Sequence, residues 1–228
     1  MTEKRLKTRR IASVICNLTA AALTAAAWCI MNRDAARSGM FSAVGLRSLR
    51  YFTVDSNLLN AFVSLLFAGN MLNLLRGRRE RISPLLQRFR LMAADAVGLT
   101  FLVVAVFLGP RLVYWQMLRG ANFIYHLLLP LLSVISFCLT DYETPLPKRA
   151  CLFAALPVPV YGAGYILNLF TNNYTGLPSK NDWYGFGTWG VGPGLCLFAA
   201  VILIAAALAR LLLFLAERAR KRTVTERR

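Results

Sequence analysis

The sequence predicts an all-α fold: a polytopic membrane bundle of about six transmembrane helices, with both termini on the same side of the membrane. Three observations predict it. Of the 228 residues, 57% are hydrophobic and only 16% are charged, which leaves too little polar surface for a water-soluble domain of this length. The apolar residues fall into six long runs, and the basic residues lie almost entirely between the runs, mostly at one end of them.

The six apolar runs are each close to or above the roughly 18–20 residues that cross the hydrocarbon layer. They are Ile11–Met31, Tyr51–Leu75, Leu91–Leu108, Ala121–Thr140, Ala150–Phe170 and Thr188–Leu215. Because lipid offers a backbone amide no hydrogen-bond partner, each run must be helical. The first run follows a basic segment, as in a signal peptide, but it is too long for one and five more runs follow. We therefore expect it to be a retained helix.

The basic residues predict the orientation. Of the 27 Lys and Arg residues, 20 lie on the side that holds both termini and only 7 on the other. This asymmetry places both termini in the cytoplasm and requires an even number of spans. We expect a basic N-terminus (1–10), a transmembrane domain (11–215) and a basic C-terminal tail (216–228). The basic residues are expected to contact anionic lipid head groups. Nucleic-acid binding is not expected, because no soluble segment interleaves basic with aromatic residues.

The sequence predicts neither a metal site nor a cofactor. All five cysteines lie in apolar runs, without a CxxC motif or a histidine cluster, which is typical of small hydrophobic residues in a helix bundle. There is no GxSxG or HExxH motif and no phosphate-binding glycine loop. The glycines between Gly185 and Gly194 are interpreted as a flexible entry to the last helix.

Polar residues inside the second run form a stripe. At about 100° per residue, four of them fall within roughly 40° of one line along a helix, with Ser56 beside it: Thr53, Asn57, Asn60 and Ser64. Lipid disfavours such a stripe, so it must face other helices or a hydrated cavity. It is either hydrogen-bonding material between helices or part of a functional site. Asp55 lies on nearly the opposite side and is assigned no catalytic role.

The only histidine, His126, lies in the fourth run, four residues before Pro130. Imidazole is costly inside a bilayer and titrates near neutrality, so a functional role competes with a structural one. Pro130 removes a backbone hydrogen bond and can kink the helix beside the histidine.

Topology brings these groups to one face of the membrane. The second and fourth helices both enter from the external side, so Thr53 and His126 lie within roughly 10 Å of that surface. The fifth helix ends there, and the loop Asn181–Phe186 follows it. A hydroxyl, a histidine base and amide donors are the minimum set for acyl transfer or ester hydrolysis. The predicted catalytic residues are Thr53 and His126, and the predicted oxyanion or substrate-binding residues are Asn57, Asn60, Asn168, Trp183 and Tyr184.

The residues Phe52-Thr53, and His126 in the fourth helix of a six-helix protein, resemble the androgen-induced-gene family, which includes the androgen-dependent TFPI-regulating protein. The runs Phe52–Asn57 and His126–Pro130 look closer to its bacterial relatives than to its animal members. Animal members of this family are intramembrane threonine hydrolases that cleave esters of fatty acids with hydroxy fatty acids. The resemblance, which spans most of helices two to five, implies that Thr53 is a nucleophile, that His126 is its base, and that the protein resides in a bacterial cytoplasmic membrane. Asp55 and the loop 181–186 have no match in the animal enzymes.

Two other interpretations remain open at this point. A transporter or lipid-binding protein is favoured by prolines within the runs and by the intramembrane Asp95, for which Arg88 or Arg90 would be a partner. A scaffold with a purely structural polar stripe is the third.

Overall fold

The fold class is confirmed: the computed structural model is an all-α bundle with six helices long and apolar enough to cross a membrane. It describes residues 3–38, 45–172, 181–185 and 190–225. The six spans are Glu3–Arg33, Phe52–Leu75, Pro84–Leu108, Ala121–Asp141, Ala150–Thr171 and Val191–Lys221. The protein therefore has the character of a multi-pass integral membrane protein. The expected start of the last span, Thr188, lies outside the described residues.

The first half of the chain forms three long helices. They are α1 (Glu3–Ser38), α2 (Phe52–Leu75) after the short 3₁₀ helix η1 (Gly45–Arg50), and α3 (Pro84–Val103), which continues through the π-helical η2 (Val104–Leu108) into α4 (Gly109–Leu112). α3 begins one to two turns earlier than the hydropathy of Leu91–Leu108 predicted. Ser83 caps it by accepting a hydrogen bond from Leu86 N at 3.2 Å, and Pro84 occupies the first turn, which suits a residue without an N–H.

The second half contains the other three spans. After the short α5 (Tyr114–Met117), one continuous helix is built from α6 (Ala121–Phe123), η3 (Ile124–Leu128), α7 (Leu129–Ser136) and η4 (Phe137–Asp141), of which η3 and η4 are π-helical. The fifth span is broken into α8 (Ala150–Ala154) and α9 (Pro157–Thr171), and α10 (Val191–Thr225) is the sixth.

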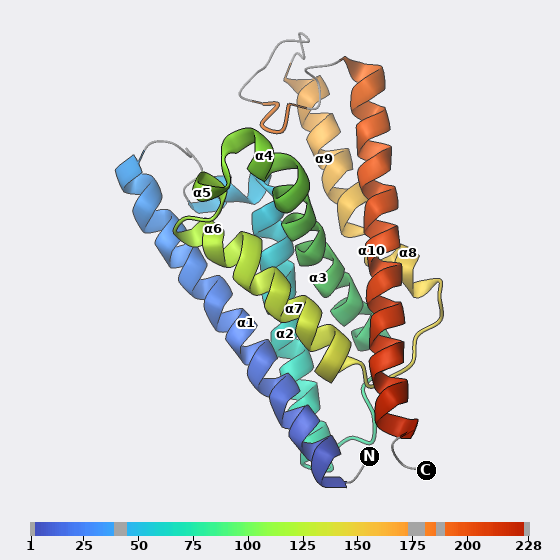
Figure 1. Cartoon of the computed structure of the whole chain (residues 1–228). Coiled ribbons are helices and arrows are strands. Elements are labelled where there is room, and N and C mark those ends of the chain that lie inside the picture. Colours follow the sequence, from blue (N-terminus) through green and yellow to red (C-terminus); the bar gives the residue numbers. More distant parts are fainter. Residues whose placement is uncertain (1–2, 39–44, 173–180, 186–189, 226–228) are drawn as a thin grey trace.

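Both termini lie at the same end of the bundle, together with the α2–α3 and η4–α8 connections (Figure 1). We call this the basic end, because it carries the excess of Lys and Arg, and we call the other the opposite end. α3 is the central helix: it packs against α2, α7, α8 and α10, while α1 covers α2 and α7. Leucine, isoleucine and phenylalanine side chains are exposed along the spans, as expected for surfaces that face lipid.

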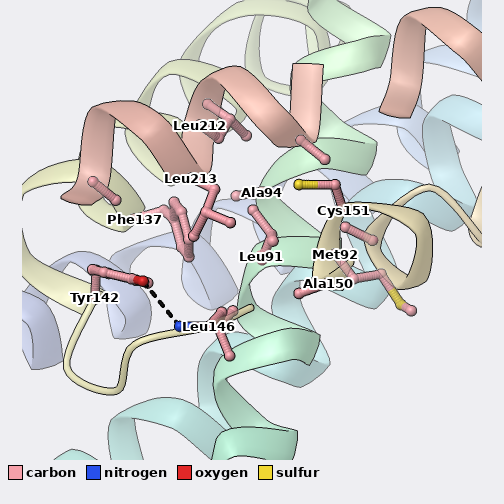
Figure 2. Packing of buried hydrophobic residues seen from close by; sticks show 13 residues of the cluster. Leu91, Met92, Ala94, Phe137, Tyr142, Leu146, Ala150, Cys151, Leu212 and Leu213 are labelled. Atoms are coloured by element: carbon pink, nitrogen blue, oxygen red, sulfur yellow. Dashed lines mark hydrogen bonds between the residues drawn. The ribbon is translucent and has the colours of Figure 1, made fainter. Parts of the chain in front are cut away.

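The largest apolar core lies where α3, η4, α8 and α10 meet. Leu91, Phe137, Leu212 and Leu213 point toward one another there (Figure 2). Tyr142, at the edge of this core, is nearly fully buried, and its hydroxyl accepts a hydrogen bond from Leu146 N at 3.0 Å. This core fixes the basic end of the bundle.

Candidate functional site

The first turn of α2 is tied to η3 by Asn57. Its Nδ2 donates to the carbonyl of Thr53 at 2.7 Å and to the carbonyl of Tyr125 at 3.3 Å. Thr53 lies one helical turn from Asn57 on the same side of α2, so this side of the first turn is directed toward η3. Thr53 itself is half-buried, while Asn57 is fully buried. The sequence stripe therefore does face a neighbouring helix.

His126 lies in η3, next in sequence to Tyr125, and only 7% of its surface is exposed. Its Nδ1 lies 2.8 Å from the carbonyl oxygen of Met117. A carbonyl oxygen only accepts, so Nδ1 must carry the hydrogen of this bond. The neutral ring then has its lone pair on Nε2, the state that a general base requires.

The π-helical turn around His126 has a local cause. Pro130 has no N–H to donate to the carbonyl of His126 four residues earlier, so an ordinary α-helical bond is missing at this point. The helix widens through Ile124–Leu128 and then returns to α-helix. Such single π-turns occur frequently at functional sites.

Thr53 and His126 are thus held on facing segments rather than bonded to each other. Within the described residues, the His126 side chain makes one hydrogen bond, to the Met117 carbonyl, and the Thr53 hydroxyl makes none. Asn57 joins the two segments: it lies one turn after Thr53 on α2, and it donates to the carbonyl of Tyr125, the residue before His126. Catalytic hydrogen bonds are often formed only in the substrate complex.

The loop residues 181–185 dock beside the same first turn. Tyr184 Oη accepts a hydrogen bond at 3.0 Å from the backbone N–H of Phe52, the residue directly before Thr53. Trp183 Nε1 donates to Tyr161 Oη at 3.1 Å, and Asn168 Nδ2 donates to the carbonyl of Asn181 at 3.1 Å. Tyr184 therefore contacts the start of α2, while Asn168 and Trp183 hold the loop that carries Tyr184. Phe186, the last residue of the predicted loop, lies outside the described residues.

An aromatic cluster consolidates this loop. The ring of Trp183 packs edge-to-face on Tyr165 at 5.0 Å and on Tyr51 at 6.3 Å, and the Arg50 guanidinium lies 5.8 Å from the Trp183 ring. Tyr165 also donates a hydrogen bond to Asp182. Burial raises the pKa of the Tyr184 phenol well above its ordinary value, so this hydroxyl remains neutral and acts as a hydrogen-bonding group.

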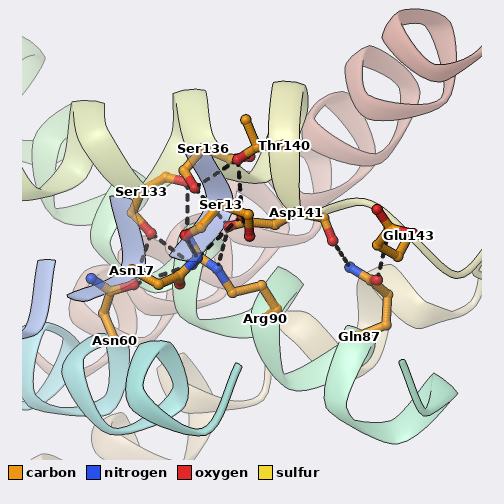
Figure 3. A network of polar contacts seen from close by, with 10 residues as sticks. All are labelled: Ser13, Asn17, Asn60, Gln87, Arg90, Ser133, Ser136, Thr140, Asp141 and Glu143. Carbon is orange, nitrogen blue, oxygen red and sulfur yellow. Dashed lines mark hydrogen bonds and ion pairs between the residues drawn. The ribbon is translucent and has the colours of Figure 1, made fainter. Parts of the chain in front are cut away.

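Asn60 belongs to a different group of residues. Its Oδ1 accepts hydrogen bonds from Ser133 Oγ at 2.7 Å and from Arg90 Nη1 at 3.3 Å. It lies seven residues from Thr53, or roughly 10 Å along the helix axis. The structure therefore places Asn60 in a buried polar network nearer the basic end (Figure 3), and away from the first turn of α2.

The centre of that network is an ion pair. Arg90 Nε lies 2.8 Å from Asp141 Oδ2, and both side chains are essentially inaccessible. Asp141 also accepts hydrogen bonds from four further side chains, on α1, α7 and η4: Ser13, Asn17, Ser136 and Thr140. Gln87 Nε2 donates to the Asp141 carbonyl at 3.1 Å. We call these residues, with Asn60 and Ser133, the Arg90 cluster.

The Arg90 cluster corrects two sequence expectations. The apolar run Leu91–Leu108 places Arg90 just outside the third helix, among the basic residues of the cytoplasmic side, but Arg90 lies inside α3 and is fully buried. Asp95 was expected to pair with Arg88 or Arg90; instead Arg90 pairs with Asp141, and Asp95 Oδ1 has no hydrogen-bond partner among the described residues. Asp141 itself was missed. Its available signal was an acidic residue ending an apolar run, after Ser133, Ser136 and Thr140 on one helical face.

The described residues contain no group of three or more histidine, cysteine, aspartate or glutamate side chains that could hold a metal ion. The five cysteines are free thiols. Comparison of the chain with protein-family models, with curated proteins and with solved structures finds no match.

Proposed function

We propose that the protein is an intramembrane hydrolase that cleaves lipid esters, with Thr53 as nucleophile and His126 as general base. The observation that supports it most is the hydrogen bond from His126 Nδ1 to the Met117 carbonyl, because it leaves Nε2 as the basic nitrogen. Asn57 joins the neighbouring residue, Tyr125, to the turn that carries Thr53. The proposal agrees with the resemblance of Phe52-Thr53 and His126 to the androgen-induced-gene family.

In the proposed reaction, His126 Nε2 accepts the proton of the Thr53 hydroxyl while Oγ1 attacks the ester carbonyl. The tetrahedral intermediate collapses, and the leaving alkoxide takes the proton from His126, which gives an alcohol and an acyl-threonine. Water, deprotonated by His126, then attacks the acyl-threonine. The acid is released and the Thr53 hydroxyl recovers its proton.

The oxyanion donors are assigned from the bonds that the candidate residues already make. Both hydrogens of the Asn57 amide are used on carbonyls, and Asn168 holds the loop. We assign both residues positioning roles. In the first turn of α2, the N–H groups of Phe52, Val54 and Asp55 already donate to Tyr184 Oη or to the Tyr51 carbonyl. The Thr53 N–H has no acceptor among the described residues, and it belongs to the nucleophile itself, so it is the proposed oxyanion donor.

The setting suits a lipid substrate. The site lies near the opposite end of the bundle, where Tyr114 and Trp115 are 48% and 72% exposed and immediately precede the segment that holds His126. Exposed tyrosine and tryptophan prefer the level of the lipid head groups. An ester bond of a membrane lipid lies at that same level, and water reaches it.

A second candidate is a transporter or binding protein for lipids or small solutes without catalytic activity. The observation that favours it is the buried carboxyl of Asp95, whose Oδ1 has no hydrogen-bond partner in the part of the chain that the structure describes, since buried carboxyls mark ion and proton paths in membrane proteins. Solute-dependent flux in liposomes would support this candidate.

The proposal is tested by labelling the purified protein in detergent with a fluorophosphonate. Attack by Thr53 Oγ1 on phosphorus expels fluoride and leaves a phosphonyl-threonine, which peptide mapping locates. We expect labelling of the wild type and of Thr53→Ser, and none of Thr53→Ala or His126→Ala. Thr171→Ala is the matched control, because Thr171 is an exposed threonine near the opposite end.

Absence of label on a folded wild type, or label that persists in Thr53→Ala, would refute the assignment of the nucleophile. Labelled protein is then given a panel of lipid esters. Labelling at Thr53 without release of fatty acid from any of them would refute the substrate class while leaving the nucleophile in place.

A further inference from the structure

Asp95 places a carboxyl group in the interior of the bundle. It lies in the middle of α3, and only 1% of its surface is exposed. Its Oδ1 makes no hydrogen bond within the described residues. The nearest cation on its own helix, Arg90, is committed to Asp141. The proposed hydrolysis does not use Asp95, so its presence needs a separate explanation.

The surroundings of Asp95 are mostly apolar. Leu91 and Ala94, which neighbour Asp95 on α3, belong to the apolar core that α3 forms with α8 and α10, as does Ala209 of α10. α7 and η2, which also pack on α3, carry no titratable residue. The titratable residues on the other elements packed against α3 are Asp55 on α2, Tyr125 and His126 on η3, Cys138 and Asp141 on η4, Cys151 on α8, Tyr161 and Tyr165 on α9, and, on α10, Cys196, Arg210, Glu217, Arg218, Arg220, Lys221 and Arg222.

Of these, Arg210 is the cation at the level of Asp95. The thiol of Cys151 on α8 lies within electrostatic range of both Asp95 and Arg210. The register of α3 and α10 agrees, because a Cβ added to Gly98 would lie 3.3 Å from Leu208 Cδ2.

The depth of both residues follows from that contact. α3 and α10 run in opposite directions (Figure 1). Asp95 lies three residues from Gly98 toward the basic end, about 4.5 Å along the axis, and Arg210 lies two residues from Leu208 in the same direction, about 3 Å. The carboxyl and the base of the arginine side chain are therefore level to within about 2 Å, yet no ion pair joins them in the described structure.

An ionised carboxylate without a partner is very unfavourable in such a place, and the group takes up a proton instead. We propose that Asp95 is a proton-binding site inside the membrane: it carries a proton in the conformation described, and its ionised form pairs with Arg210. The arginine side chain is long enough to extend toward the basic end in one state and toward Asp95 in the other.

Dicyclohexylcarbodiimide tests this proposal, because this apolar reagent reacts with protonated carboxyls in water-poor sites. The acid O–H adds across one C=N bond: the carboxyl oxygen bonds to the central carbon and the proton goes to nitrogen. The resulting O-acylisourea rearranges to a stable N-acylurea with no leaving group. Asp141 serves as an internal comparison, since its carboxyl oxygens are already bonded to Arg90 and to four neighbouring side chains, and we expect it to remain unmodified.

We expect one reagent mass on the peptide that contains Asp95 when the protein is labelled near neutral pH in detergent or liposomes. Asp95→Asn, which keeps the shape of the side chain, should lose this modification and retain a native elution profile. A water-soluble carbodiimide should not modify Asp95. A folded wild type with no modification at Asp95, or with equal modification by the water-soluble reagent, would overturn the proposal.

The partner is tested by the pH dependence of the same labelling. In the wild type, Arg210 stabilises the ionised form, so labelling should fall as the pH rises. In Arg210→Gln it should persist to higher pH, by at least one pH unit, while Arg210→Lys should resemble the wild type. Identical profiles for the wild type and Arg210→Gln would overturn the role of Arg210. None of these outcomes depends on Thr53, so they are independent of the proposed hydrolysis.

Discussion

Breaking the Arg90–Asp141 ion pair is expected to be the most destabilising single polar substitution in the bundle. In Arg90→Met, the carboxylate of Asp141 keeps its hydrogen bonds from Ser13, Asn17, Ser136 and Thr140. It loses its counter-charge, however, in a place from which water is excluded. Removing one partner of a buried pair typically costs about 3–5 kcal/mol, because the remaining charge stays desolvated.

This cost is measurable as a melting temperature. At about 2–4 °C per kcal/mol for a chain of this size, Arg90→Met should lower the Tm by roughly 6–20 °C in a thermal denaturation assay in detergent. Asp141→Asn should lower it by a similar amount, since it leaves the guanidinium unpaired. Arg78→Met removes the same charge from an exposed site at the basic end, and we expect it to change the Tm little.

Combining the two substitutions tests whether the loss of stability comes from an uncompensated charge. If the loss comes from an uncompensated charge, Arg90→Met with Asp141→Asn should be less destabilised than the sum of the single variants, by about 2–3 kcal/mol. Strict additivity, or single effects below about 1 kcal/mol, would show that the pair is not the source of the stability and would refute the reasoning.

Three further predictions concern the surrounding structure. Gly162→Ala places a Cβ 1.8 Å from Phe198 Cζ, so it should cost about 1–3 kcal/mol in the same melting assay, and much less in a Phe198→Ala background. Gln87→Ala removes bonds to the Asp141 carbonyl and to the Glu143 and Thr144 amides; we expect a loss of about 2–4 kcal/mol and faster amide exchange at those two amides. The raised pKa of Tyr184 stabilises the fold below pH 10, its ordinary pKa, and this contribution is lost as the pH rises toward the folded pKa. Tyr184→Phe should remove that alkaline loss from a Tm–pH profile.

Hydropathy and charge were sufficient to predict the six helices, because lipid imposes a strong and local constraint on each segment. They placed the start of α3 too late, since Gln87, Arg88 and Arg90 make its first turns polar. The local signal was nevertheless present in Ser83-Pro84, a helix cap followed by a first-turn proline.

The pairing of Arg90 with Asp141 could not be predicted in the same way. The two residues are 51 positions apart, and a count of basic residues treats every arginine as solvated. Only the rotation of α3 decides whether Arg90 faces water or the bundle. The same holds for Asn60. It belongs to the sequence stripe of Thr53, but it lies two turns further along α2, where its Oδ1 accepts hydrogen bonds from Arg90 and Ser133.

The orientation of Thr53 follows from contacts on both sides of it along α2. Toward the basic end, Asn60 Oδ1 accepts a hydrogen bond from Arg90 on α3, and Ser56 Oγ lies 3.0 Å from Thr100 Oγ1 on the same helix. At the level of the site, Asn57 fixes η3, and at the start of the helix the Phe52 amide donates to Tyr184. These contacts leave α2 little freedom to rotate, so its polar side must face η3. It follows that a variant such as Asn57→Leu, which removes the contact to η3 but leaves Thr53 and His126 unchanged, should reduce fluorophosphonate labelling while the melting temperature changes by only a few degrees.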